Sequence, residues 1–339
     1  MTNSTDFGLY LTKYLSDYLP NQINASKNTA LAYRDTFSLL LEYMEKVCKS
    51  SPDKLTIAML DVPAVVGFLS WLESDRGYTV SSRNHRLAIV RAFFKFLQFE
   101  NPKYLAHCQG ILGIRHKKTH SKPPEFLSKE AMTAILSMPD IRTRNSYRDL
   151  VLLALMYDTG ARVQEICDLR VCDIKFQEFP SITLHGKGNK SRNVPIMAKT
   201  TALLEKYIAT LELAQDATDT LLFLSHRKHR LTRNGIAFIL RKYAKQAREK
   251  NPGLIPEKVS PHMMRHSKAM HLVQSGVNII YIRDFLGHTN IKATEIYARA
   301  DSEMKRLALS KAGQEKISPN NASWNKDAGL VAWLKAFGK

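Results

Sequence analysis

The sequence predicts a mainly α-helical protein with one small antiparallel β-sheet, divided into two domains. Three observations predict this fold class. The 339 residues exceed the length of an average domain. Apolar residues recur at helical spacing through the first third and again near the end. Between these regions, two segments of β-forming residues flank the glycine-rich stretch GKGN, which is typical of a β-hairpin.

Residues 1–112 are predicted to form a helical first domain. One helix spans 27–47, with Ser26 as a possible N-cap. A second helix spans 62–76, with Pro63 near its start and Gly77 after its end. A third spans 79–100. The apolar face of the first helix is expected to hold Leu31, Phe37, Leu40, Leu41 and Met44, and that of the third Leu87, Val90, Phe94 and Leu97.

Residues 113–126 are predicted to be an interdomain linker, because they are basic, contain a proline pair and lack apolar periodicity. The nearby Cys108, His116 and His120 match no common zinc-site spacing and lack a clear fourth ligand. We therefore expect no metal there, and read the linker lysines as phosphate contacts.

Residues 127–300 are predicted to form a mixed second domain. A buried helix over 144–159 ends at Gly160, and a short helix follows over 161–169. Strands are expected at 173–176, 181–185 and 191–196, with a possible fourth at 221–224. Five helices follow the hairpin, at 198–214, 232–250, 260–275, 278–286 and 291–300. The tail, 301–339, places Leu330, Val331, Trp333, Leu334 and Phe337 on an apolar face.

The charge balance indicates a polyanionic partner. Lys and Arg number 50 against 31 Asp and Glu, a net charge of +19, and nucleic acid is the commonest polyanion for such a surface. A merely cationic soluble protein is the alternative. Four scattered cysteines fit a reducing compartment, and we see neither a signal peptide nor a membrane-spanning stretch. We expect a cytoplasmic, nucleoid-associated protein.

The second domain holds polar residues suited to phosphoryl transfer: Arg162, Lys187, His262, Arg265, His288 and Tyr297. Arginines clamp a phosphate and stay charged, histidine and lysine move protons, and tyrosine is a nucleophile. No carboxylate cluster suited to Mg²⁺ accompanies them, so we expect no cofactor. Taken singly, each residue has an ordinary structural explanation.

Four segments in this order resemble the motifs of the tyrosine recombinase, or phage integrase, family: TGARVQEICDL, HGKGNKSRNVPI, SPHMMRHSKAMHLVQSG and LGHTNIKATEIY. The resemblance implies that Arg162 and Arg265 hold the scissile phosphate, that His288 binds it and that Glu165 supports the site. His262 matches the first position of the family's His-x-x-Arg motif. It implies that Lys187 is the general acid and Tyr297 the nucleophile of a 3′-phosphotyrosyl intermediate. The helical first third is similar to that family's core-DNA-binding domain. Lys268 departs from the apolar residue of many members, which leaves local packing open.

The expected partner is double-stranded DNA with paired inverted-repeat core sites, gripped between the two domains by a homotetramer or by a tetramer that includes a related recombinase. The expected DNA contacts are Ser82, Arg83, Arg86, Lys117, Lys118, Lys190, Arg192, Arg227, Lys228 and Arg230. The tail helix would dock on a neighbouring protomer or on its own domain. Integration, transposition and Xer-type dimer resolution remain open as biological roles. A type IB topoisomerase-like relaxase and a non-catalytic DNA-binding protein are the rival functions.

Overall fold

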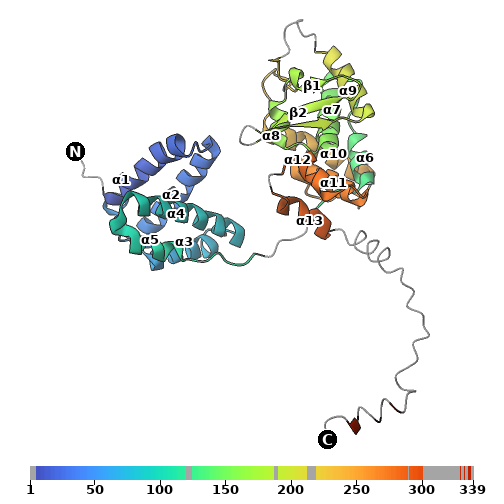
Figure 1. Cartoon of the computed structure of the whole chain (residues 1–339). Helices are drawn as coiled ribbons and strands as arrows, with labels where there is room; N and C mark the ends of the chain where they lie inside the picture. Colours follow the sequence, from blue (N-terminus) through green and yellow to red (C-terminus); the bar gives the residue numbers. More distant parts are fainter. Residues whose placement is uncertain are drawn as a thin grey trace. The chain divides into compact units, whose positions relative to one another are not determined.

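The computed structural model describes residues 5–119, 124–186, 190–211, 219–288 and 290–300, and four single residues of the tail. This part of the chain is mostly helical and contains one three-stranded antiparallel sheet, so the predicted fold class is confirmed (Figure 1). The chain divides into two compact units, Met1–Ser121 and Lys122–Lys339, and the division falls within the segment expected to be the linker. No helix in these described ranges is both long and apolar enough to cross a bilayer.

The first unit is a helical bundle built around α4. Its helices are α1 (Asp6–Lys13), the π-helical η1 (Tyr14–Gln22), α2 (Lys27–Lys46), α3 (Val62–Ser74), α4 (Val80–Glu100) and α5 (Leu105–Leu112), with 3₁₀ turns η2 (Pro52–Lys54) and η3 (Pro102–Tyr104). Helix α4 packs against α2, α3 and α5. Its four predicted core residues are all fully buried.

Local sequence signals set the helix starts in this unit. The side chains of Ser26, Asp61 and Thr79 accept hydrogen bonds from backbone N–H groups in the first turns of α2, α3 and α4.

The expectation that Leu31 lies on the apolar face of α2 is wrong, because this side chain is 37% exposed. Phe37 lies six positions after Leu31, which at about 100° per residue places the two side chains about 120° apart around the helix.

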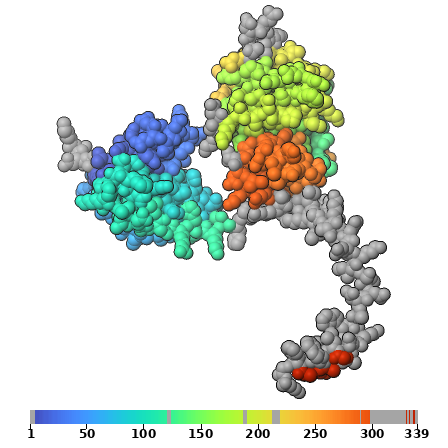
Figure 2. Space-filling view, viewed as in Figure 1, coloured from blue at the N-terminus to red at the C-terminus, as the bar shows by residue number. Residues whose placement is uncertain are grey.

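The second unit joins helices to the small sheet. Its elements are α6 (Lys129–Leu136), α7 (Arg144–Thr159), α8 (Val163–Asp168), η4 (Val171–Asp173), β1 (Ile174–Lys175), β2 (Ser181–His185), β3 (Ser191–Pro195), α9 (Ala198–Ala209), α10 (Arg233–Lys250), α11 (Pro261–Gln274), α12 (Ile279–Leu286) and α13 (Lys292–Ala300). In the space-filling view α11, α12 and α13, coloured orange, form one continuous mass against the green and yellow part of this unit (Figure 2).

The sheet has the order β1-β2-β3, and β2 pairs with β3 in the predicted hairpin. The possible fourth strand at 221–224 does not form, and only isolated bridges occur at Leu221 and Leu224. Two consecutive residues, Leu222 and Phe223, are both buried, which a strand with one exposed face does not allow. The backbone N–H of Leu222 donates instead to the carbonyl of Leu169, just after α8.

Two glycines end helices beside each other and so define the place where the site forms. Gly160 ends α7 and Gly287 ends α12, both with left-handed backbone angles (φ 57° and 63°). A Cβ at Gly160 would lie 2.9 Å from the side chain of Leu286, so the end of α7 touches the end of α12. Helix α11 packs against α7, α12 and α13. The polar residues predicted from sequence lie around this junction.

Candidate active site

A buried carboxylate joins two arginines in the second unit. Glu165, in the first turn of α8, is 4% exposed. It accepts hydrogen bonds from the backbone N–H of Arg162 (2.7 Å) and its Nη1 (2.9 Å), and from Nη1 and Nη2 of Arg192 on β3 (2.9 and 2.8 Å). Burial alone would raise the pKa of Glu165, but the bonds and charges of Arg192 and Arg162 lower it. Glu165 is therefore ionised and fixes both guanidinium groups.

Backbone carbonyls at the two helix ends hold three arginines. Arg265, on α11, donates from Nη1 to the carbonyl of Gly160 and from Nη2 to that of Leu286, each at 2.6 Å. Arg162 Nη2 donates to the carbonyl of Gly287 (3.0 Å), and Arg192 Nε donates to that of Phe285 (3.0 Å). Carbonyls at a helix C-terminus lack intrahelical partners and carry partial negative charge, so they suit cationic donors.

Clustering three like charges affects Arg265 most. Burial, and then the charges of Arg162 and Arg192, lower the pKa of Arg265 to about 10. This guanidinium still carries its charge at neutral pH. The cluster thus has three cations against the single carboxylate of Glu165, and a bound anion would relieve the repulsion.

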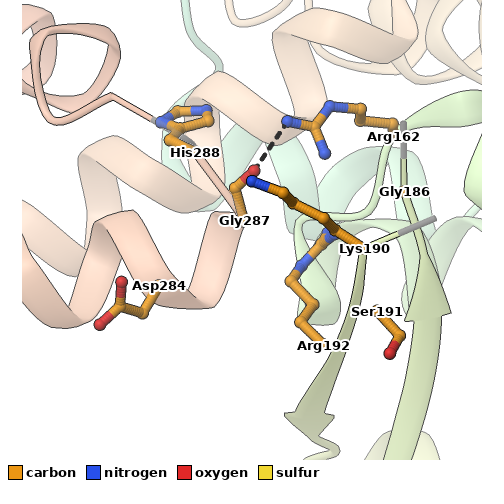
Figure 3. Close-up of a pocket in the computed structure, with 8 residues that line it drawn as sticks. All are labelled: Arg162, Gly186, Lys190, Ser191, Arg192, Asp284, Gly287 and His288. Carbon is orange, nitrogen blue, oxygen red and sulfur yellow. Dashed lines mark hydrogen bonds between the residues drawn. The ribbon is translucent and has the colours of Figure 1, made fainter. Parts of the chain in front are cut away.

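Two of these arginines, Arg162 and Arg192, border a cavity of about 450 Å³. Its lining consists of Arg162, Gly186, Lys190, Ser191, Arg192, Asp284, Gly287 and His288. Figure 3 shows Arg162, Lys190 and Arg192 on one side and Gly287 with His288 on the other. The carboxylate of Asp284 forms an ion pair with Arg283. The lining is therefore strongly cationic, which favours a phosphate group.

Tyr297 lies in α13 beside this cavity's histidine. Its side chain is 2% exposed, and its ring stacks on that of His288 with centroids 6.5 Å apart and planes 13° from parallel. The Tyr297 hydroxyl hydrogen-bonds Nδ1 of His266 on α11 at 2.7 Å. Burial raises the pKa of Tyr297, and the charge of Arg265 lowers it by less. The phenol therefore keeps its proton at neutral pH until a base removes it.

His288 is neutral in this setting. Its Nδ1 hydrogen-bonds the hydroxyl of the buried Thr294 at 2.9 Å. Burial, followed by the charges of Arg265, Arg162 and Arg192, lowers the pKa of His288 to about 4. At neutral pH its imidazole can donate one hydrogen bond and accept another, and it adds no charge to the arginine cluster.

The structure brings together five of the catalytic residues predicted from sequence: Arg162, Glu165, Arg265, His288 and Tyr297. His262 is exposed in the first turn of α11, and its ring stacks on that of His266 with centroids 6.4 Å apart. Lys187 lies outside the described residues. So do the tail residues expected to form an apolar helix face, Leu330, Val331, Trp333, Leu334 and Phe337.

The predicted DNA contacts divide into two groups. Ser82, Lys118, Lys190, Arg227 and Lys228 are exposed. Lys117 and Arg230 are also exposed, but Lys117 pairs with Glu73 and Arg230 with Asp168. The other three are engaged within their own units. Arg83 is buried against Asn84, Arg86 donates to the Ala32 carbonyl and the Thr36 hydroxyl, and Arg192 pairs with Glu165. Arg86 therefore has a structural role in joining α4 to α2.

Sequence reasoning missed His266. The available signal was its position four residues after His262, which places both rings on one face of α11. It also assigned Arg192 to DNA contact alone, although this side chain anchors Glu165 and lines the cavity. The question about Lys268 has a structural answer: its amine pairs with the buried Asp158 at 3.3 Å and lies over the Tyr157 and Phe285 rings.

The comparisons with known proteins bear on this arrangement directly. Residues 125–304 match the description "Phage integrase family", and residues 11–101 match "Phage integrase, N-terminal SAM-like domain". The first match alone covers more than half of the chain. The chain belongs to the phage integrase family. The resemblance drawn from the four sequence motifs is thereby confirmed.

Relatives of this integrase-family chain carry matching names. A Sinorhizobium fredii protein with the provisional name integrase/recombinase y4rC is 33% identical over 337 residues, covering 99% of this chain and all of that protein. The tyrosine recombinase XerD of Staphylococcus epidermidis is 31% identical over 299 residues, covering 87% of this chain and 95% of XerD. These relatives make the chain a tyrosine recombinase, an enzyme class that cleaves and rejoins DNA.

Solved structures show the same fold. The Tn1549 transposon integrase, in complex with transposon right-end DNA, has a TM-score of 0.68 at 16% identity, covering 91% of this chain and 99% of that one. XerH recombinase bound to its difH substrate, in a post-cleavage complex, has a TM-score of 0.65 at 22% identity, covering 91% and 90%. At these identities the likeness establishes the fold.

Proposed function

We propose that this tyrosine recombinase cuts double-stranded DNA by attack of the Tyr297 hydroxyl on a backbone phosphate held by Arg162 and Arg265. The attack leaves a 3′-phosphotyrosyl bond and a free 5′-hydroxyl, which later reverses the reaction. One observation supports the proposal most strongly. His288 lines the cationic cavity and stacks on the nucleophile, so the phosphate site and the tyrosine are neighbours.

The residues have distinct roles in this proposal. Arg162 and Arg265 bind the non-bridging oxygens and stabilise the negative charge that grows on them in the transition state. Glu165 holds Arg162 in place through its two bonds. His288, neutral and half-buried, donates a further hydrogen bond to the phosphate. Lys187, which family resemblance makes the general acid, gives a proton to the leaving 5′-oxygen.

The energetics need neither ATP nor a metal ion. A phosphotyrosyl ester replaces a phosphodiester, so the energy of the broken bond is kept for rejoining. The charge stabilisation that metal ions give in many phosphoryl transfers would come here from fixed guanidinium groups. Because the arginines are already held by Glu165 and by carbonyls, little reorganisation is needed when the phosphate arrives.

For the biological role, we favour integration, excision or transposition of a mobile element, with Xer-type dimer resolution as the alternative. The fold shared with the Tn1549 transposon integrase supports the first, and the similarity to XerD supports the second. In either role, a homotetramer would act on paired inverted-repeat core sites in the cytoplasm, at the nucleoid. A related recombinase would replace some protomers if the sites are asymmetric, and the tail would link protomers or fold back on its own domain.

The test is covalent capture from a pool of duplexes with a randomised centre. The expected result is a detergent-resistant protein–DNA adduct, with recovered sequences that converge on an inverted repeat. Tyr297→Phe should form none, whereas Tyr157→Phe, which loses a hydroxyl bonded to His271 outside the site, should form it normally. Adducts on unrelated sequences, together with relaxation of a supercoiled plasmid lacking the repeat, would favour a topoisomerase-like relaxase instead.

A further inference from the structure

We propose that His266 accepts the proton of the Tyr297 hydroxyl when DNA is cleaved and returns it when the strand is rejoined. This inference rests on the proposed function and extends it, since none of the roles assigned above removes the proton from the nucleophile. The phenol must lose that proton to attack phosphorus, and it is buried within the protein.

The geometry favours His266 over every other group in the described part of the chain. Its Nδ1 lies 2.7 Å from the Tyr297 oxygen, within the range for direct proton transfer. The two rings are tilted by 54° with centroids 5.6 Å apart, so a ring nitrogen rather than the ring face meets the hydroxyl. Because Tyr297 is almost fully buried, solvent is poorly placed to take the proton.

The two other histidines near Tyr297 are less suited. His288 presents its ring face to the tyrosine ring, and its Nδ1 is occupied by Thr294. Its pKa of about 4 also makes it a weak base. His262 is exposed and meets the ring of His266 rather than the tyrosine.

The electrostatic surroundings of His266 fit a reversible proton acceptor. Burial, then His262 and Arg265, lower the pKa of His266, so its imidazole is neutral at neutral pH and has a free lone pair. The groups facing it are His262 and Arg265 on α11, His288 after α12 and Tyr297 on α13. An imidazolium formed near Arg265 gives up its proton readily, which suits the return step in rejoining.

Cleavage forms one bond, breaks one bond and moves two protons. The Tyr297 oxygen forms a bond to phosphorus, the bond from phosphorus to the 5′-oxygen breaks, and the phenol proton moves to Nδ1 of His266. The 5′-oxygen leaves as a hydroxyl with a proton from a separate donor, the role that family resemblance gives to Lys187. Rejoining runs each transfer in reverse, so no oxidant, reductant or cofactor is consumed.

The chain supplies a matched control on the same helix. His271 also hydrogen-bonds a tyrosine hydroxyl through Nδ1, that of Tyr157 at 2.8 Å, and it is likewise removed from solvent. It has no contact with Tyr297 among the interactions of the described residues. His271→Ala therefore removes an equivalent histidine–tyrosine bond without touching the nucleophile.

The experiment measures the rate of single-turnover adduct formation on the duplex recovered by covalent capture. This duplex is synthesised with a nick, so that the cleaved end diffuses away and the strand is not rejoined. His266→Ala should slow the adduct step by about 10²–10⁴-fold, the usual value of a general base, while binding that duplex normally. His266→Asn, which keeps a hydrogen-bonding atom near Nδ1 but no base, should be equally slow. His271→Ala should react at the wild-type rate.

Two further measurements separate a base from a positioning residue. The slow variants should speed up as the pH rises towards the pKa of the phenol, and 3-fluorotyrosine at position 297, a more acidic phenol, should partly restore His266→Asn. A 5′-bridging phosphorothiolate, whose leaving group needs no proton, should not rescue either variant.

Several outcomes would overturn the inference. They are wild-type adduct rates for His266→Ala, recovery of the full rate by His266→Asn, or rescue by the phosphorothiolate. If His266→Ala does not bind the duplex, His266→Asn with and without fluorotyrosine decides the matter. If the unaltered chain itself forms no adduct on any captured duplex, the proposed function fails as well. Equal rates in all variants reject only the role of His266.

Discussion

Replacing Glu165 by glutamine tests whether this carboxylate holds the arginine cluster together. The glutamine has nearly the same shape but no charge, and its amide group would point N–H donors at guanidinium donors. Glu165 currently accepts four hydrogen bonds from Arg162 and Arg192. In the variant, three cationic side chains would share one junction without a carboxylate between them. Their repulsion matters because the charges of Arg162 and Arg192 already lower the pKa of Arg265.

The magnitude follows from burial. Removing one partner of a buried ion pair costs about 3–5 kcal/mol. The side chain of Arg192 is 12% exposed and that of Arg162 is 35% exposed, so solvent screens Arg162 in part and the lower end applies. A loss of about 3 kcal/mol lowers the melting temperature of a unit of this size by roughly 6–12 °C.

Calorimetry in a buffer of low ionic strength is the suitable assay, because the two units can melt in separate transitions. We expect only the transition of the second unit to shift. Phosphate should restore a large part of the loss, since it supplies negative charge at the same place. Glu205→Gln, an exposed position on α9, is the control and should change stability by less than about 0.5 kcal/mol. An unshifted Glu165→Gln transition without anions would refute the reasoning.

Three other predictions concern the same junction. Gly287→Ala should abolish adduct formation and cost more stability than Gly276→Ala. Both glycines have positive φ, but a Cβ at Gly287 would lie 2.9 Å from Arg192, whereas a Cβ at Gly276 would meet no atom within 4 Å. Equal effects of the two substitutions on melting and activity would contradict the close packing at Gly287. The contribution of His288 to the free energy of unfolding should be complete above about pH 6.5 and should fall as the pH drops towards 4. The reason is that His288 in the unfolded chain binds a proton in this range, whereas folded His288, with a pKa of about 4, does not. A melting temperature that stays constant between pH 6.5 and 4.5 would count against this prediction. Adduct formation should continue at an unchanged rate in excess EDTA, because side chains supply the positive charge that stabilises the transition state. A loss of activity in EDTA that Mg²⁺ restores would contradict this prediction.

Sequence patterns predicted the parts of this molecule that local chemistry determines. Ser26 caps the helix expected to follow it, and the GKGN stretch joins two paired strands. Motif order also identified the residues around the α7–α12 junction. These signals lie within short segments, where propensity and periodicity act directly.

Tertiary packing decided what sequence could not. The segment 221–224 has strand-like composition, but its backbone bonds to the loop after α8. Arg83 looks like a surface cation and is buried against Asn84. His266 meets Tyr297 only because α11 packs on α13, 31 residues further along the chain. The contacts of Leu222 and His266 join residues far apart in the chain, so no local pattern contains them.

The most direct test of the central claim is to locate the bond between protein and DNA. The captured adduct would be digested with protease and nuclease, and the nucleotide-bearing peptide sequenced by mass spectrometry. We predict a 3′-nucleotide phosphate on the oxygen of Tyr297, and a free 5′-hydroxyl on the other DNA end. A nucleotide on any other residue, or an adduct that persists in Tyr297→Phe, would contradict the account.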